Sequence, residues 1–150
     1  MFFMLRDLIA WFIWLLIADK ERWREIVPVC FFAGFLGATT DNIIHHHPLW
    51  TYPSKQPLLP LLGDDWGIYF VVTYLFIQSL PKQHTFWRIS LHLFIFANTG
   101  LIIEWLHVIT NHMTHERWWN YGYSYFANVI LYLMFYYFYK IFRLPKLNEK

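Results

Sequence analysis

Long runs of apolar residues alternate with short polar connections along most of this chain. The runs are Leu8–Ala18, Ile26–Ile44, Trp66–Leu80, Phe86–Ile109 and Tyr121–Phe142. Because they are continuous and lack helical stripes or strand alternation, they predict helices that are apolar on all sides. About 20 such residues cross the apolar core of a bilayer. The pattern therefore predicts an all-α integral membrane helical bundle, one transmembrane helical domain over residues 1–150.

The first run is short. Counted from Phe2 to Ala18 it has seventeen residues, with Arg6 and Asp7 among them. At about 1.5 Å per residue it reaches roughly 25 Å, the lower limit for a span. The bundle thus has five transmembrane helices, or four and one helix in the membrane interface.

Composition agrees with membrane insertion. The chain is 57% hydrophobic and only 15% charged, against about 25% charged residues in ordinary globular domains. A soluble domain of this size needs more polar surface, so the lipid bilayer is the expected partner. The net charge of +2 is spread over several connections, which does not indicate nucleic-acid binding. The single cysteine, Cys30, is expected to be a packed side chain.

Lysine and arginine are concentrated on one side of this predicted bundle. Nine of the twelve lie in the segments Asp19–Glu25 and Pro81–Arg88 and in the C-terminal tail from Lys140. The other three are Arg6, Lys55 and Arg117. The positive-inside rule makes the richer side cytoplasmic. We therefore expect a multipass protein of the plasma membrane with its N-terminus outside and its C-terminus in the cytoplasm.

The stretch Thr39–Trp66 is the most polar part of the chain between two apolar runs, and it carries three acids. In the predicted topology, Asp41 and Glu104 lie near the outer ends of helices that run outward. Asp64 and Asp65 lie at the outer beginning of a helix that runs inward. We therefore expect these four carboxylates at one depth, in a polar site of the outer leaflet.

Glu104 belongs to a polar face of the fourth run. Glu104, His107 and Asn111 are spaced i, i+3 and i+7, and Ala97 and Gly100 extend this face with small residues, which suggests that it faces the bundle. A carboxylate in a membrane helix is costly and normally faces the protein interior or water. The carboxylate of Glu104 is therefore either functional or fixes the register of neighbouring helices.

Two other interpretations concern helix capping and metal binding. Asp64–Asp65 could cap the third helix through its free backbone N–H groups. His45–His47 are three adjacent histidines, whereas His112 and His115 are spaced better for a shared ligand. Neither set shows the fixed spacing of a known zinc motif. A divalent metal at His112 and His115 is thus one possibility, and no other cofactor is expected.

Aromatic residues gather at the same predicted outer boundary. They form a headgroup belt or line a cavity for a lipophilic ligand or a cationic intermediate. In the second case the ligand would meet side chains from both outer connections and the adjoining helices: Trp50, Tyr52, Trp66, His107, Trp119, Asn120, Ser124 and Asn128.

A series of short motifs runs through most of the chain: Trp23 with Pro28, Asp41, Pro48-Leu49-Trp50-x-Tyr52, Pro81, Glu104, Trp119-Asn120, Ser124 and Asn128. In this order the chain resembles an uncharacterised family of small multipass membrane proteins of Gram-positive spore-forming bacteria, over roughly Trp23 to Lys140. The resemblance implies a topology and supplies no mechanism.

A second resemblance rests on five residues: Asp41, Trp50, Tyr52, Asp64 and Asp65. Their layout looks like that of small membrane-embedded carotenoid and terpenoid cyclases, although Gly-Asp-Asp stands where Pro-x-Glu-Glu is expected. In such enzymes an intramembrane acid protonates an alkene or epoxide, and aromatic faces stabilise the carbocation. The resemblance implies a lipophilic, isoprenoid-like substrate.

Three functions remain open at this point. The first is a non-catalytic scaffold or partner subunit whose buried acids fix packing. The second is an acid-initiated cyclase or isomerase acting on a lipophilic substrate. Its general acid would be Glu104 or Asp65, with a pKa raised by burial, and Asp64 and Asp41 would complete the catalytic set.

The third is a proton- or metal-coupled transporter or ion-binding protein. It requires a polar path that continues inward through Asn98 and His92. A chain this small would need a homo-oligomer or a membrane partner protein to build such a path.

Overall fold

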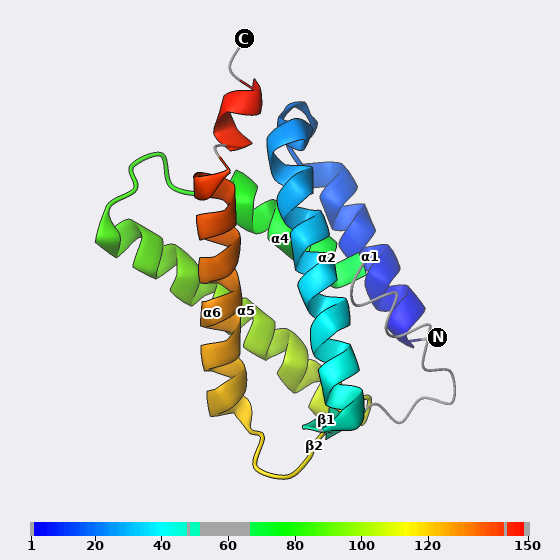
Figure 1. The fold of residues 1–150 in the computed structure, drawn as a ribbon. Helices are drawn as coiled ribbons and strands as arrows, with labels where there is room; N and C mark the ends of the chain where they lie inside the picture. Colours follow the sequence, from blue (N-terminus) through cyan, green and yellow to red (C-terminus); the bar gives the residue numbers. More distant parts are fainter. Residues whose placement is uncertain (1, 48, 52–66, 143, 149–150) are drawn as a thin grey trace. The chain divides into compact units, whose positions relative to one another are not determined.

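A computed structural model describes residues 2–47, 49–51, 67–142 and 144–148. These residues are mostly helical, which confirms the all-α prediction. Two-residue strands β1 (Trp50–Thr51) and β2 (Thr114–His115) and 3-10 helices η1 (Lys20–Arg22) and η3 (Leu144–Asn148) accompany the α-helices. In the described ranges there are five α-helices (Figure 1): α1 (Phe2–Ile17), α2 (Trp23–His46), α4 (Tyr69–Gln78), α5 (Phe86–Ile109) and α6 (Tyr121–Ile141).

Most helix boundaries lie close to the ends of the apolar runs, but α2 is longer than predicted. It begins at Trp23 and continues to His46, so the first two histidines of the triplet are helical and the predicted start of the connection at His45 is wrong. No proline or glycine lies between Gly37 and Pro48, and a proline disfavours helical geometry at the residue before it. The helix can therefore run on through polar residues.

The chain divides into two compact units. The first comprises Met1–Asp41, Gln56–Ser79 and Phe135–Lys150, and the second comprises Asn42–Lys55 and Leu80–Met134. Helices α2 and α6 each contribute residues to both. The single transmembrane domain over residues 1–150 stays a prediction.

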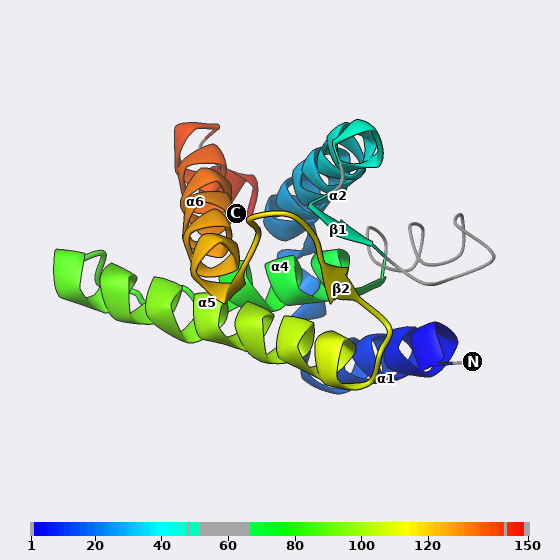
Figure 2. The ribbon, with the colours of Figure 1, turned by 90° about the horizontal axis from the view of Figure 1, so that it is seen from below.

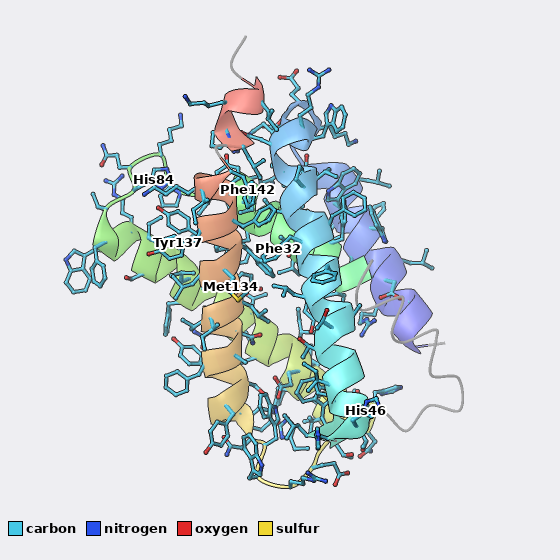
Figure 3. The ribbon with its side chains drawn as sticks, viewed as in Figure 1. Phe32, His46, His84, Met134, Tyr137 and Phe142 are labelled. Carbon is cyan, nitrogen blue, oxygen red and sulfur yellow. The ribbon has the colours of Figure 1, made fainter. Side chains whose placement is uncertain are left out.

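The first unit has an aromatic and aliphatic core. Helix α2 buries Cys30, as expected for a packed thiol. Phe32 points from α2 toward α6, where it stacks on Phe138 with ring centroids 4.4 Å apart (Figure 3). Trp11 of α1 stacks on Phe70 of α4 at 5.3 Å. The remaining core side chains come from α2, α4 and the end of α6: Ile26, Val29, Ala33, Val71, Tyr74, Phe76, Ile77, Phe135, Tyr136 and Tyr139.

Helix ends of the first unit meet around Arg22. Its guanidinium forms an ion pair with Glu25 in the first turn of α2. It also donates to the carbonyl oxygen of Gln78 at the end of α4 (2.9 Å) and to the hydroxyl of Tyr139 near the end of α6 (3.3 Å). Tyr139 in turn donates to Oε2 of Glu25 (3.1 Å). Glu25 is only 3% exposed, so these hydrogen bonds offset the desolvation of its charge.

The same cluster holds the corner between α1 and α2. Gln78 donates through Nε2 to the carbonyl oxygen of Ile17 (3.1 Å) and accepts from the backbone N–H of Asp19 (2.8 Å). Partial burial alone would lower the pKa of Arg22, but the hydrogen bond and charge of Glu25 raise it above its ordinary value. The connection Asp19–Glu25 is therefore a structured joint, in which the charged Arg22 is paired with Glu25.

In the second unit, α5 packs against α6 through small residues. Ala97 is fully buried, and a Cβ atom at Gly100 would lie 2.7 Å from Nδ2 of Asn128. This confirms the prediction that the small-residue face of the fourth run packs inside the protein. Strands β1 and β2 lie side by side (Figure 2), with antiparallel partners Trp50↔His115 and Thr51↔Thr114. They join the segment after α2 to the connection between α5 and α6.

Much of the apolar surface remains exposed. Among the described residues, α5 alone has the length and composition to cross a membrane, and only 11% of its most apolar stretch is buried. Large apolar side chains of α1 are also exposed, including Leu8, Phe12 and Leu16. Helix α4 is apolar but has ten residues.

Candidate functional site

A polar network surrounds Glu104 inside the second unit. Glu104 lies near the end of α5, and its side chain is 13% exposed. Its Oε1 accepts a hydrogen bond from Nε2 of His115 (2.7 Å) and another from the hydroxyl of Ser124 (2.6 Å). His115 belongs to β2 and Ser124 to the first turn of α6. One carboxylate oxygen thus joins α5, β2 and α6.

Trp119 completes this arrangement. Its indole Nε1 donates to the hydroxyl oxygen of Ser124 (2.8 Å), and Ser124 is buried. Since the indole only donates, the serine hydroxyl must accept from it and give its own proton to the carboxylate. An ionised carboxylate likewise only accepts, so Nε2 of His115 carries a proton. Glu104, His115, Ser124 and Trp119 are named the Glu104 network below.

The end of α5 sets the direction of the connection that follows. Thr110 donates through its hydroxyl to the carbonyl oxygen of Leu106 (2.6 Å). Asn111 then has a φ of 56°, the left-handed geometry that commonly ends helices and that asparagine tolerates. The predicted helical face of Glu104, His107 and Asn111 is therefore wrong at its third member, because Asn111 lies beyond the last turn.

A second turn places Ser124. Arg117 also has a left-handed φ, 57°, and reverses the chain after β2. Asn120 then accepts from the backbone N–H groups of Gly122 (2.9 Å) and Tyr123 (3.3 Å) through its side-chain oxygen. This is helix N-capping. Asn120, predicted to bind substrate, is occupied in starting α6 so that Ser124 faces Glu104.

The strand pair holds His115. Beside it, the backbone N–H of Glu116 donates to the carbonyl oxygen of Leu49 (2.7 Å). The hydroxyls of Thr51 and Thr114 are 2.8 Å apart. The imidazole of His115 also meets the ring of Tyr121 edge to face, with centroids 4.8 Å apart. Backbone pairing therefore fixes the position from which His115 reaches Glu104.

An aromatic cluster surrounds the network. Trp50 and Trp119 lie with ring centroids 5.2 Å apart, and Trp119 stacks on Tyr123 at 6.0 Å. Trp118 contacts Tyr123 at 5.0 Å, and both are largely exposed. The indole N–H of Trp50 is buried and has no hydrogen-bond partner among the residues that the structure describes. The rings shield the polar atoms of the network from solvent on one side.

Other predicted residues have different surroundings. His107 is buried, with Nδ1 2.6 Å from the carbonyl oxygen of Ile103 in its own helix. Asn128 lies against Gly100. Nδ1 of His112 is 3.0 Å from the hydroxyl of Thr110, whereas His115 binds Glu104. In the part of the chain that the structure describes, no three His, Cys, Asp or Glu side chains are grouped to hold a metal ion.

Several predicted residues lie outside the described part of the chain: Tyr52, Asp64, Asp65 and Trp66. Asp41 belongs to α2 by its backbone, but its side chain is likewise outside the description. The convergence of these acids with Glu104 therefore stays a prediction.

The order of the polar groups differs from that of a nucleophilic triad. In a Ser-His-Asp triad the imidazole lies between serine and acid and takes the serine proton. Here the carboxylate receives hydrogen bonds from both Ser124 and His115 at the same oxygen. The geometry joins three segments and does not activate the serine through histidine.

Comparisons of the chain with protein-family models, with curated proteins and with solved structures find no match. The interpretation of the Glu104 network rests on its own geometry. Sequence reasoning included all four of its residues as candidates but missed the cluster of Arg22, Glu25 and Tyr139. The i, i+3 spacing of Arg22 and Glu25 was a signal for the local pair, while nothing pointed to Tyr139.

Proposed function

We propose that this chain is a multipass integral membrane protein of the plasma membrane that serves as a small scaffold or partner subunit. In this proposal the Glu104 network is a structural joint that holds the outer connections together. The observation that carries it is the double hydrogen bond to Oε1 of Glu104, from His115 and from Ser124.

Exposed apolar side chains support the membrane part. Leu91, Phe94, Ile95 and Ile102 of α5 are all more than half exposed. In water, an apolar helix of this length would need burial in a core, and large exposed apolar patches mark interaction surfaces. Lipid covers such side chains, so a bilayer explains why α5 is apolar and so little of it is buried.

Helix directions within each unit support the proposed alternation across the membrane. In the first unit, the ends of α1 and α4 meet the start of α2 around Gln78 and Arg22. In the second, the end of α5 meets the start of α6 at Glu104 and Ser124. Both junctions fit helices that run in alternate directions across a membrane.

The energetics favour a structural role for the network. A carboxylate near the membrane interior carries a desolvation penalty of several kcal/mol, which good hydrogen bonds must offset. Hydrogen bonds to a charged group contribute about 1.5–3 kcal/mol each. The two donors to Glu104, His115 and Ser124, supply stabilisation of this order. They offset the desolvation penalty of the carboxylate, which then links α5 to β2 and α6.

The Glu104→Gln variant tests this proposal. It keeps the shape and removes the charge, so the hydrogen bonds from His115 and Ser124 weaken. We expect the free energy of unfolding to fall by about 1–3 kcal/mol, measured by thermal unfolding of the purified protein in lipid nanodiscs. The matched control is Glu116→Gln, because Glu116 lies in the connection after α5 and, among the described residues, its side chain accepts from the exposed threonines Thr51 and Thr114 alone. A Glu104→Gln protein as stable as wild type, with its cellular phenotype lost, would argue for catalysis.

One observation favours a second candidate, the acid-initiated cyclase or isomerase on a lipophilic, isoprenoid-like substrate. Among the described residues, Oε2 of Glu104 accepts no hydrogen bond, and the rings of Trp119 and Trp50 lie beside the network. A free carboxyl oxygen beside aromatic faces is what such chemistry uses. Turnover of a polyprenyl substrate by purified protein, lost in a stable Glu104→Gln variant, would favour this candidate.

A further inference from the structure

Four exposed cations gather at one end of the first unit and are named the basic rim: Lys20 in η1, Arg24 in the first turn of α2, Lys140 in the last turn of α6 and Lys146 in η3. The contacts of Arg22 with Glu25 and Tyr139 place these segments next to one another. Within the described ranges, no cation of the basic rim forms an ion pair. The buried carboxylate of Glu25 is paired with Arg22 and not with a cation of the basic rim.

Aromatic rings accompany three of the four cations. Nζ of Lys20 lies 5.9 Å from the ring centroid of Trp14, and Nζ of Lys140 lies 5.8 Å from that of Tyr136. The guanidinium carbon of Arg24 lies 5.6 Å from the ring of Trp23, which is half exposed. Tryptophan and tyrosine beside basic residues are typical of the headgroup level of a membrane.

Exposed apolar surface borders the basic rim. The last turn of α1 exposes Leu15, Leu16 and Ile17, and Lys20 follows three residues later. Nζ of Lys20 reaches back to donate to the carbonyl oxygen of Leu15 (3.2 Å). Next to Lys140, the side chains of Ile141 and Phe142 are exposed, and Leu147 is exposed beside Lys146. The basic rim thus adjoins apolar surface on both α1 and α6.

We propose that the basic rim binds anionic phospholipid of the cytoplasmic leaflet. The lipid phosphate meets the cations, and its acyl chains lie on the exposed apolar residues of α1 and α6. Charge complementarity selects an anionic headgroup, and the adjoining apolar surface selects a lipid over a soluble anion. The inference rests on the membrane placement in the proposed function, but it names a partner and a surface far in sequence from Glu104.

Brominated phospholipids in nanodiscs test the proposal, because bromine quenches the fluorescence of nearby tryptophans such as Trp14 and Trp23. We expect brominated phosphatidylglycerol to bind wild-type protein more tightly than brominated phosphatidylcholine. Each cation removed should lower this preference about fivefold, so the Lys20→Gln/Lys140→Gln protein should show a marked loss. The charge-retaining Lys20→Arg/Lys140→Arg protein should keep the preference, and circular dichroism checks that each variant folds.

The matched control is Lys82→Gln/Arg88→Gln, which removes two cations from the second unit. It should leave the preference unchanged. Equal binding of the two lipids by wild type, or an equal loss in the control, would overturn the proposal. Competition by inorganic phosphate would also overturn it, because the site would then recognise a free anion. Extraction of the chain from membranes by alkaline carbonate would instead contradict the membrane placement itself.

Discussion

At the scale of single residues, the carboxylate of Glu104, which is costly to bury, links α5 to β2 and α6 through hydrogen bonds. A largely buried carboxylate must find donors, and here one side chain from a strand and one from a helix supply them. Ser124 has the central place, since it accepts from Trp119 and donates to Glu104. The network therefore depends on the hydroxyl of Ser124.

The Ser124→Ala variant tests this role. Removing the hydroxyl leaves the indole N–H of Trp119 without its acceptor and Glu104 with one donor fewer. We expect a loss of about 1–3 kcal/mol in the free energy of unfolding, measured by denaturant titration. Ser79→Ala is the control, because among the described residues the Ser79 hydroxyl bonds only to carbonyl oxygens of the helix that it ends, α4. Equal effects of the two variants would contradict the role of Ser124.

The sequence predicted which residues belong to this site better than how they bond. The topology placed Glu104, His115 and Ser124 on one side of the membrane. It did not distinguish His115 from His112, because two left-handed residues, Asn111 and Arg117, determine which histidine turns toward α5. Such single-residue conformations follow from tertiary packing and leave no periodic pattern in the sequence.

At the scale of elements, the long helices were predictable and the strands were not. The bounds of α5 match its apolar run because no proline or polar cluster interrupts it. Strands of two residues have no alternation to detect, so the pairing of Trp50 with His115 was unforeseen. The role of Gln78 in joining helix ends was also hidden, because its partners Ile17, Asp19 and Arg22 lie 56 to 61 residues away in the sequence.

The contact between α5 and α6 can be tested at Gly100. A Cβ atom there would lie 2.7 Å from Nδ2 of Asn128, closer than packing allows. Gly100→Ala should therefore destabilise the protein by about 1–3 kcal/mol. In an Asn128→Ala background the space is free, and the same change should stabilise it by up to about 1 kcal/mol through helix propensity. Thermal unfolding measures both, and equal effects in the two backgrounds would contradict the contact.

At the scale of the whole molecule, each of the two units has a polar joint. Arg22, Glu25 and Tyr139 bind helix ends in the first unit, and the Glu104 network does so in the second. Buried polar groups that are fully paired specify one arrangement of helices. Such joints suit a scaffold, which must present a constant surface to a partner.

A double-mutant cycle between Glu104 and His115, measured by unfolding of the protein in lipid nanodiscs, tests the central claim most directly. Glu104→Gln, His115→Ala and the combined variant are each compared with wild type. If the two side chains form a structural joint, we expect a coupling energy of about 1–3 kcal/mol. Additive effects of the two substitutions would contradict it.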